Sequence, residues 1–325
     1  MIDAGIVGLG WWGNRLIESV QGKSDRIRFV HGVARDPATK QEVARRHGLA
    51  LSPTIAAMMA DPAVQAVVLA TPHSMHRTDI EAVVAAGKPV FCEKPLTLTA
   101  ADAVRAVGAA RTAGTLLAVG HNRRFLPALA EMKRQVEEGA LGEILHVEGH
   151  FSNENSSSAF APWRHDQEES PAGGMTGTGI HVLDVFVSLL GPVRSVHAQL
   201  VSRKAAPGPI DTLSVLLRFE NDVTGTLGAV RATPRYWRTH LFGTERSVEL
   251  LQEDTLMIRA AGQPDPIHRA FPAVDTLRLE LEAFADAILG RKPYPICDND
   301  MIATVAAFEA ICRSVRSGRT ETVGA

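Results

Sequence analysis

The stretch Ile6-Val7-Gly8-Leu9-Gly10-Trp11-Trp12-Gly13 decides how the first part of this chain folds. Its three glycines fit the pattern G-x-G-x-x-G, and they follow a short apolar run and precede a segment suited to a helix. The first glycine allows a tight turn, the second lets the backbone approach a pyrophosphate, and the third lets helix and strand pack closely. The positive end of the helix then faces the phosphates. We therefore expect a dinucleotide-binding loop at residues 8–13.

Strand-like and helix-like segments alternate from this loop to about residue 120. Short apolar runs predict buried strands, and Asp36-Pro37, Thr99 and Gly114 mark helix ends. Such alternation requires crossover connections, so the strands form a parallel sheet. We expect an α/β chain whose residues 1–121 form an NAD(P)-binding domain with a doubly wound Rossmann sheet. The predicted strands after the first are 28–34, 66–70, 89–92 and 116–119.

The pattern changes after about residue 121. Leu213, Val215, Leu217 and Phe219 alternate with other residues, as in a sheet with one covered face. The chain ends in a segment of helical periodicity from Asp298 to Gly318. We expect residues 122–325 to form a second α/β domain with an open, largely antiparallel sheet, whose free face needs helices or another subunit. Similar strand-like stretches occur near 144–151, 194–202, 223–231, 246–251 and 255–260.

The bulk composition narrows the class of protein. The chain has 325 residues, of which 45% are hydrophobic and 22% charged, with a formal net charge of −2. This balance provides no general attraction for nucleic acid or an anionic membrane, and no apolar run approaches the roughly 20 residues of a membrane span. Three cysteines without a CxxC pair favour a reducing compartment. We expect a cytoplasmic protein without a secretory leader.

The end of the second predicted strand bears on which dinucleotide binds. An NAD site usually has an acidic residue there to bind the ribose 2′-hydroxyl, but this chain has Ala34 followed by Arg35. A guanidinium can bind a 2′-phosphate. Asp36 could serve as the acid, although an Asp before a Pro at a helix start is more typical of a cap. We therefore favour NADP over NAD as the cofactor.

Several further motifs carry a resemblance to a known family. They are Thr71-Pro72-His73-Ser74-Met75-His76, Phe91-Cys92-Glu93-Lys94-Pro95, the run from Gly120 to Phe125, and the segment from Gly173 through His181 to Asp184. Each is weak alone, but together with the glycine loop they resemble the glucose-fructose oxidoreductase, inositol dehydrogenase and rhizopine-catabolism (Gfo/Idh/MocA) family over essentially the whole chain. That resemblance implies a Rossmann domain, a second domain whose open sheet builds homodimers or homotetramers, and a site between them.

The resemblance also implies roles for individual residues. Lys94 would be the central catalytic lysine, and its ammonium would polarise the substrate oxygen that gains or loses a proton. Arg123 suits a carboxylate or phosphate, with an ion pair between domains as the alternative. Together with the glycine loop, the resemblance implies a cofactor site of Gly8, Gly10, Trp11, Trp12, Gly13, Ala34, Arg35, Thr71, Pro72, His76, Glu93 and Lys94. The implied substrate site contains Lys94, Asn122, Arg123, Trp163, Thr178 and His181.

One position departs from the family pattern. Members often carry an Asp four residues before the His that corresponds to His181, and Gly177 stands there in this chain. Lys94 and His181 then form the expected acid/base pair, because an imidazole exchanges protons near neutrality. The alternative for His181 is a buried core histidine, and we expect a structural role for Asp184. No HExxH motif or Cys/His cluster occurs, so we expect no catalytic metal.

These observations predict an NAD(P)-dependent dehydrogenase or reductase. It would interconvert a secondary alcohol and a ketone on a sugar, cyclitol, diol or similar small polar substrate. One alternative retains the cofactor and uses transient oxidation for epimerisation, elimination or glycoside cleavage. Another is a cofactor-binding regulatory protein that has lost catalysis, as Gly177 could indicate.

Overall fold

The computed structural model describes residues 1–154, 162–204 and 209–324, and it divides into two compact units. The first unit contains Met1–Asn122 and Asp275–Met301, and the second contains Arg123–Val274 and Ile302–Ala325. The predicted boundary near residue 121 lies at the end of the first segment. The return of residues 275–301 to the first unit has no counterpart in the sequence pattern, because hydrophobic periodicity reports a helix and not the sheet on which it packs.

A six-stranded parallel sheet forms the centre of the first unit. Its strand order is β3-β2-β1-β4-β5-β6, and every neighbouring pair is parallel. This order confirms the predicted doubly wound Rossmann sheet. All of its strands except the edge strand β3 are fully or mostly buried, as their continuous apolar runs indicate. The strands are β1 (Ile2–Val7), β2 (Ile27–Val33), β3 (Ala50–Ser52), β4 (Ala66–Leu69), β5 (Val90–Glu93) and β6 (Leu117–Gly120).

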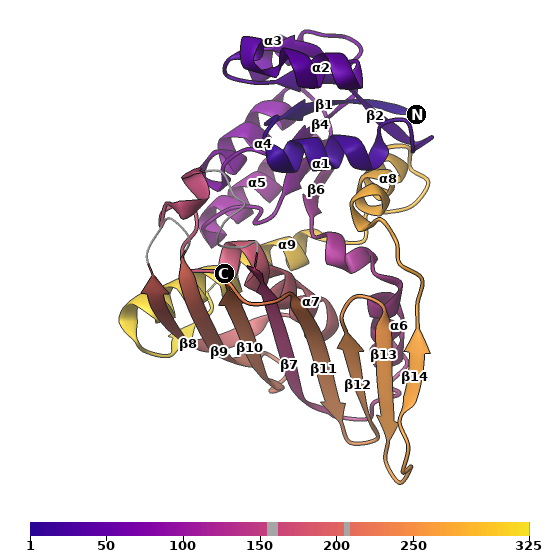
Figure 1. The fold of residues 1–325 in the computed structure, drawn as a ribbon, viewed down its shortest axis with the longest axis vertical. Helices are drawn as coiled ribbons and strands as arrows, with labels where there is room; N and C mark the ends of the chain where they lie inside the picture. The colour runs from indigo at the N-terminus through magenta and orange to yellow at the C-terminus, as the bar shows by residue number, and fades with distance from the viewer. Residues whose placement is uncertain (155–161, 205–208, 325) are drawn as a thin grey trace. The chain divides into compact units, whose positions relative to one another are not determined.

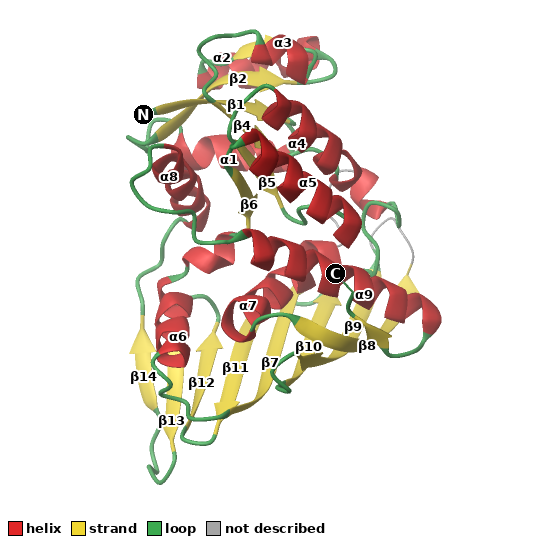
Figure 2. Cartoon of the chain, turned by 180° about the vertical axis from the view of Figure 1, so that it is seen from behind, coloured by secondary structure: helices red, strands yellow, loops and turns green. Residues whose placement is uncertain are grey.

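Helices cover both faces of this sheet: Figures 1 and 2 show α1 and α8 on one face and α4 and α5 on the other. Local chemistry sets their ends. The Thr99 hydroxyl accepts a hydrogen bond from the backbone N–H of Asp102 at the start of α5, and Gly114 ends that helix with φ of 63°. The helices are α1 (Trp11–Val20), α2 (Gln41–His47), α3 (Ile55–Met59), α4 (His76–Ala85), α5 (Ala100–Ala113) and α8 (Thr276–Ile288).

A nine-stranded sheet forms the second unit, in the order β14-β13-β12-β11-β7-β10-β9-β8-β15. Its strands pair antiparallel except for β7 with β10, which confirms the predicted largely antiparallel sheet. The strands are β7 (Ile144–Asn153), β8 (Val193–Lys204), β9 (Ile210–Phe219), β10 (Thr224–Arg231), β11 (Tyr236–Gly243), β12 (Arg246–Leu251), β13 (Thr255–Ala260), β14 (Ile267–Ala270) and β15 (Glu321–Thr322).

Strand β11 is central in this sheet but was not among the predicted strands. It buries Trp237, Thr239 and Leu241 on one side, while Arg238 and His240 lie between them. Because the buried set includes a threonine and the intervening residues are long polar ones, the apolar alternation is too weak to identify the strand. Pairing with β7 and β12 supplies what the local pattern lacks.

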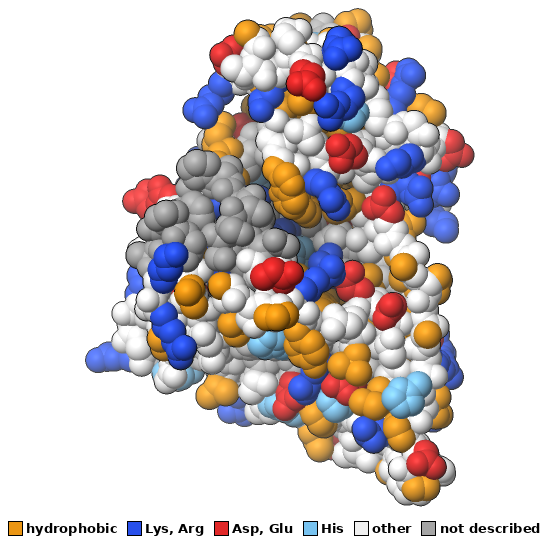
Figure 3. Space-filling model, in the orientation of Figure 1, with side chains coloured by type: hydrophobic (Ala, Val, Ile, Leu, Met, Phe, Trp, Pro, Cys, Tyr) orange, Lys and Arg blue, Asp and Glu red, His pale blue; other side chains and the backbone are white. Residues whose placement is uncertain are grey.

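Helices lie on only one face of the nine-stranded sheet. Figure 2 shows α6 (Pro127–Glu137), α7 (Ile180–Leu190) and α9 (Asp298–Ser317) in front of the strands, and Figure 1 shows the opposite face without helices. On that face, hydrophobic, histidine and charged side chains lie intermixed (Figure 3). Large apolar side chains exposed from its strands include Val201, Ile210, Leu216 and Tyr236. In the described residues, no helix has the length and apolar composition needed to cross a lipid bilayer.

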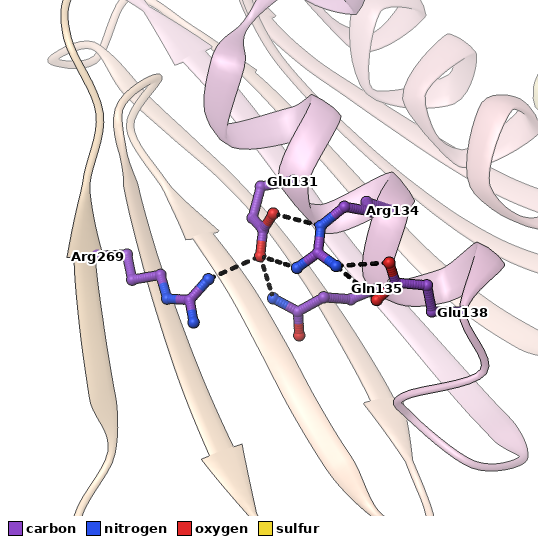
Figure 4. Close-up of polar contacts among 5 residues, drawn as sticks. All are labelled: Glu131, Arg134, Gln135, Glu138 and Arg269. Carbon is purple, nitrogen blue, oxygen red and sulfur yellow. Dashed lines mark hydrogen bonds and ion pairs between the residues drawn. The ribbon is translucent and has the colours of Figure 1, made fainter.

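A cluster of polar side chains fastens α6 to the edge strand β14 (Figure 4). The Glu131 carboxylate accepts hydrogen bonds from Arg134 at 2.8 Å, from Gln135 at 3.0 Å and from Arg269 of β14 at 2.8 Å. The hydrogen bonds from Arg134 lower the pKa of Glu131 from 4.5 to about 2, with smaller contributions from Gln135 and the charge of Arg269. The cluster therefore stabilises the end of the sheet in the ionised state.

We expect Glu131→Gln to destabilise the chain in a pH-dependent way. The folded-state pKa is depressed, so the contribution of Glu131 is fully present above its ordinary value of 4.5 and is lost as the pH falls toward about 2. In urea unfolding between pH 7 and pH 3, the difference between wild type and variant should be constant at the upper end and narrow below about pH 4.5. Glu137→Gln, which removes an exposed pair with Lys133, is the control and should show a much smaller difference. A Glu131→Gln difference that does not vary with pH would contradict this assignment.

Candidate functional site

The glycine loop joins β1 to α1 at the point where the order of the sheet reverses, since β2 and β4 lie on opposite sides of β1. Gly8 has a φ of 98°, and a Cβ there would lie 2.4 Å from the carbonyl oxygen of Ala70. A Cβ on Gly13 would lie 2.0 Å from the carbonyl oxygen of Gly8. By contrast, a Cβ on Gly10 would meet no atom within 4 Å. The loop is therefore packed tightly on its protein side and has space at Gly10.

The two tryptophans of the loop differ in exposure. Trp11 is 53% exposed, and the guanidinium of Arg15 lies 5.9 Å from its ring centroid. Trp12 is half-buried, and its indole Nε1 is buried with no hydrogen-bond partner in the described part of the chain. A buried indole N–H usually has an acceptor. The open space at Gly10, the first turn of α1 and this unpaired donor fit a dinucleotide in the loop.

The end of β2 lies beside this loop. The backbone N–H of Gly8 donates to the carbonyl of Val33, and that of Ala34 donates to Ser52. Arg35 is exposed, whereas the Asp36 carboxylate accepts a hydrogen bond from the backbone N–H of Ala38 at 3.1 Å. Asp36 therefore caps the 3₁₀ turn that begins at Pro37, which is the capping role weighed above against ribose binding.

The loops after β4 and β5 are tied to each other by His76. Its ring nitrogens lie 2.8 Å from the carbonyl oxygen of Pro95 and 3.1 Å from that of Thr71. The Thr71 hydroxyl donates to Asp79 at 2.9 Å, and burial raises the pKa of that carboxyl. His76 is fully buried in these contacts, so its geometry supports a positioning role between the two loops.

Glu93 is the last residue of β5, and Lys94 follows it directly. Both are buried, at 5% and 8% exposure, and the backbone N–H of Lys94 donates to the Glu93 carboxylate at 3.3 Å. The Lys94–Pro95 peptide bond is cis. Because parallel strands end at the same edge of a sheet, the first unit gathers the glycine loop, Arg35, Thr71 and Lys94 along one edge.

Asn122 ends the first segment of the first unit. Its side-chain amide donates to the hydroxyl of Thr276 at 2.8 Å, and both residues are buried. Thr276 opens α8, so this contact connects the end of β6 to the returning part of the chain. The structure thus gives Asn122 a structural partner, while the substrate-binding role predicted for it stays a prediction.

In the second unit, the segment leading to His181 forms a π-helical turn, Met175–Gly179, that continues into α7. The Thr178 hydroxyl donates to the carbonyl of Gly174 at 3.0 Å, and Thr178 is buried. His181 is 5% exposed, and its ring centroid lies 6.0 Å from that of Phe151 on β7. A Cβ on Gly177 would meet no atom of the described residues within 4 Å, so these residues leave space at the position of the family's Asp.

Arg123 shares this neighbourhood. Its guanidinium lies 5.6 Å from the ring centroid of Phe151 and 5.7 Å from that of Trp237, and it pairs with Glu253 at 2.9 Å. Phe151 therefore contacts both Arg123 and His181, two of the residues predicted for the substrate site. The pair with Glu253 lies within the second unit, and both interpretations of Arg123 stay predictions. Trp163 is half-buried and contacts Arg164, whose guanidinium lies 4.5 Å from its ring centroid.

Arg124 and Asp184 form a buried ion pair. The sequence predicted a structural role for Asp184 but did not identify Arg124 as its partner. Two guanidinium nitrogens of Arg124 donate to the two carboxylate oxygens of Asp184 at 2.7 and 2.9 Å, and the side chains are 5% and 1% exposed. The pair holds the start of α7, one turn beyond His181, to the segment after β6. Arg124 could have been found from the sequence, because it lies in the Asn122-Arg123-Arg124 motif. No sequence motif marks Phe151, Trp237 or Glu253 as part of the site.

Within the described residues, no three His, Cys, Asp or Glu side chains lie together as a metal site would require. Pairs such as His73 and His76 pack edge to face, with ring centroids 5.7 Å apart. Lys94 belongs to the first unit and His181 to the second.

Comparisons with known proteins match both units. A family model described as an oxidoreductase family with an NAD-binding Rossmann fold matches residues 2–121, and one described as the GFO/IDH/MocA C-terminal domain matches residues 129–249. Inositol 2-dehydrogenase 1 of Saccharopolyspora erythraea is 30% identical over 328 residues, which cover 98% of this chain and 95% of that protein. Inositol 2-dehydrogenase 2 of the same organism is 32% identical, with coverage of 99% and 95%.

A solved structure extends the likeness in fold. Levoglucosan dehydrogenase in complex with NADH and L-sorbose superposes with a TM-score of 0.87 over 99% of both chains, at 24% sequence identity.

The glycine loop allows packing and ligand binding to be separated by two matched substitutions. Gly13→Ala would place a methyl group against the backbone carbonyl of Gly8 and should cost about 1–3 kcal/mol of stability. Gly10→Ala places its methyl group in open space, so the free protein should keep its stability within about 0.5 kcal/mol while losing affinity for a dinucleotide. Thermal unfolding without ligand and a dinucleotide titration measure the two effects. A Gly10→Ala variant that binds as wild type does would contradict this placement of the ligand.

Proposed function

Because the chain belongs to the Gfo/Idh/MocA family of oxidoreductases, we propose that it is a dehydrogenase or reductase of small polar alcohols. It interconverts a secondary alcohol and a ketone on a sugar, cyclitol, diol or similar substrate with NAD(P) as the redox partner. The observation that carries this proposal is the pairing of an intact dinucleotide loop with the buried Lys94, both at the carboxyl edge of the parallel sheet. The inositol 2-dehydrogenases support a cyclitol or related polyol as substrate.

In this proposal the nicotinamide supplies the hydride acceptor or donor when it is bound. The chain's own residues bind the substrate oxygen and transfer its proton. As a neutral amine, Nζ of Lys94 accepts the proton of the substrate hydroxyl while the alcohol becomes a ketone, and as the resulting ammonium it returns that proton to the oxygen in reduction. His181, in the second unit, is the second acid/base group of the proposal, since an imidazole is suited to proton transfer near neutrality. Arg123, Trp163 and Thr178 orient the rest of the substrate, with Asn122 at its edge.

Burial explains why these groups suit such a reaction. Lys94 and His181 are both less than 10% exposed, and an ionic hydrogen bond strengthens as water is excluded from it. Because Gly177 occupies the position of the family's Asp, no carboxylate is available there for proton transfer. Lys94 and His181 are then the acid/base groups of the proposal. The space around Gly177 supports a substrate hydroxyl or a water in place of that carboxylate.

The cofactor site supports NADP(H) in preference to NAD(H). Arg35 is exposed at the end of β2, and Asp36 uses its carboxylate as a helix cap. The position therefore offers a guanidinium for a 2′-phosphate, and the neighbouring carboxylate is engaged as a cap in place of a ribose ligand. The solved levoglucosan dehydrogenase complex contains NADH, so the same fold also accepts the unphosphorylated cofactor in that protein.

The open face of the nine-stranded sheet supports assembly of two or four copies of the chain. Its strands expose Val201, Leu216 and Tyr236 to solvent. The same face has a hollow of about 530 Å³, whose lining includes His150 and Arg238. Broad sheets are seldom left bare on one face, and a second copy would cover the apolar side chains while its polar groups meet the charged ones. We propose the reducing cytoplasm as the compartment, since all three cysteines are free thiols.

Lys94→Met tests the catalytic assignment. It preserves length and removes the ammonium, so kcat should fall by about 10²–10⁴-fold while the affinity for the cofactor stays within about twofold of wild type. Turnover would be measured on a panel of cyclitols, hexoses and vicinal diols with NAD⁺ and NADP⁺. Lys23→Met, at an exposed lysine of the first unit, is the matched control. Undiminished turnover in Lys94→Met would exclude the proposed role, and wild-type binding without turnover on the whole panel would favour the regulatory alternative.

Arg35→Ala tests the choice of dinucleotide. Quenching of tryptophan fluorescence should show tighter binding of NADPH than of NADH to wild type. The variant should lose about tenfold in NADPH affinity, equivalent to about 1.4 kcal/mol, with NADH affinity unchanged. Arg46→Ala, which removes an exposed arginine of α2, controls for the general loss of positive charge. If NADH binds as tightly as NADPH in both wild type and Arg35→Ala, the NADP preference is wrong.

A further inference from the structure

A second cavity, of about 420 Å³, lies wholly within the second unit. It is bordered by the end of β8, the start of β9, the segment 164–173 and the last turns of α9. Its charged lining consists of Arg164, Arg231 and Arg316 together with one carboxylate, Asp211. We call it the arginine pocket. The lining therefore contains three guanidinium groups and one carboxylate.

Arg231 gives the pocket a built polar wall. Its side chain is 9% exposed, Nη1 lies 3.6 Å from an oxygen of Asp211, and Nη2 donates to the carbonyl of Gly173. Its Nε is buried and has no hydrogen-bond partner in the described part of the chain. Burial lowers the pKa of Arg231, against the opposing effect of Asp211. A buried cation at this distance from one carboxylate is incompletely compensated, and a further negative group would stabilise it.

The other two arginines reach the pocket from separate parts of the chain. Arg164 comes from the 3₁₀ turn at 162–165 and stacks on Trp163. Arg316 is exposed in the last turn of α9, and no hydrogen bond or ion pair of its side chain is found among the described residues, although its charge contributes to lowering the pKa of Glu321. Bringing like charges together costs free energy unless an anion neutralises them.

The neutral lining agrees with an anionic ligand. Cys312 lines the pocket, and burial raises the pKa of its thiol to about 12, so it adds no negative charge near neutral pH. The hydroxyls of Ser170 and Ser202 supply further donors. A volume of this size holds a small organic molecule and not only a single ion.

We propose that the arginine pocket binds a small dianion, of the phosphate or dicarboxylate class, held between Arg164, Arg231 and Arg316. A planar guanidinium matches both groups because it donates two parallel hydrogen bonds to neighbouring oxygens. The pocket is distinct from the site around His181. None of the residues predicted for the substrate site lines this pocket. His181 packs on Phe151 of β7, which β10 separates from β9.

Calorimetric titration of the full chain without cofactor tests this proposal, with inorganic phosphate and malonate as separate probes at ionic strength matched with chloride. We expect at least one of them to bind with a millimolar or lower Kd. Arg316→Ala and Arg164→Ala should each weaken that binding by about tenfold or more. Arg319→Ala, an exposed arginine just beyond α9 that does not line the pocket, should leave it unchanged.

Arg316 is exposed, so its substitution should leave the fold intact, and a thermal melt confirms this for each variant. Binding of phosphate alone would assign the pocket to phosphate-bearing ligands, and binding of malonate alone to dicarboxylates. The proposal is overturned if neither probe binds, or if Arg316→Ala binds within about twofold of wild type. Phosphate binding lost in Gly10→Ala but kept in Arg316→Ala would place the anion at the glycine loop and also overturn it. This test does not depend on the proposed dehydrogenase activity, since it needs neither cofactor nor substrate.

Discussion

Helix α1 approaches β1 so closely that a methyl group on Gly13 would overlap the carbonyl of Gly8. This contact sets the direction of the helix relative to the central strand, and with it the direction of the backbone N–H groups in the first turn. Gly8 is held from the other side by the backbone of Ala70 after β4. The loop is thus fixed by backbone on two sides and open on the third, which is the condition for binding a pyrophosphate without rearrangement.

The remaining candidate groups of the first unit depend on the same arrangement. Since all six strands are parallel, the residues after β2, β4 and β5 lie along the edge that bears the glycine loop. His76 then joins two of these loops through the carbonyls of Thr71 and Pro95. Lys94 is therefore held between the end of β5 and Pro95, whose carbonyl contacts the ring of His76.

In the second unit, an ion pair between side chains positions the candidate residues. A buried, bidentate ion pair between Arg124 and Asp184 holds the start of α7, and with it the turn that carries His181. Removing one partner of such a pair would leave an uncompensated buried charge. The sheet beneath is covered by helices on one face only (Figures 1 and 2), so the unit carries His181 over the middle strand β7 on its covered face and leaves a broad surface open on the other.

The sequence by itself determined the strand–helix alternation of the first unit, the glycine loop and the largely antiparallel sheet. These features have local causes: the glycines are needed where no side chain fits, and buried strands require apolar runs. It also indicated the capping role of Asp36 and the motif around Lys94. Only the tertiary structure returned residues 275–301 to the first unit, placed β11 in the middle of a sheet, and brought Phe151 and Trp237 against Arg123. It likewise gathered the arginine pocket from segments far apart in the chain. The reason is physical: a local pattern records what each residue needs from its own strand or helix, whereas these contacts join residues tens to hundreds of positions apart, whose pairing is decided by packing of the whole unit.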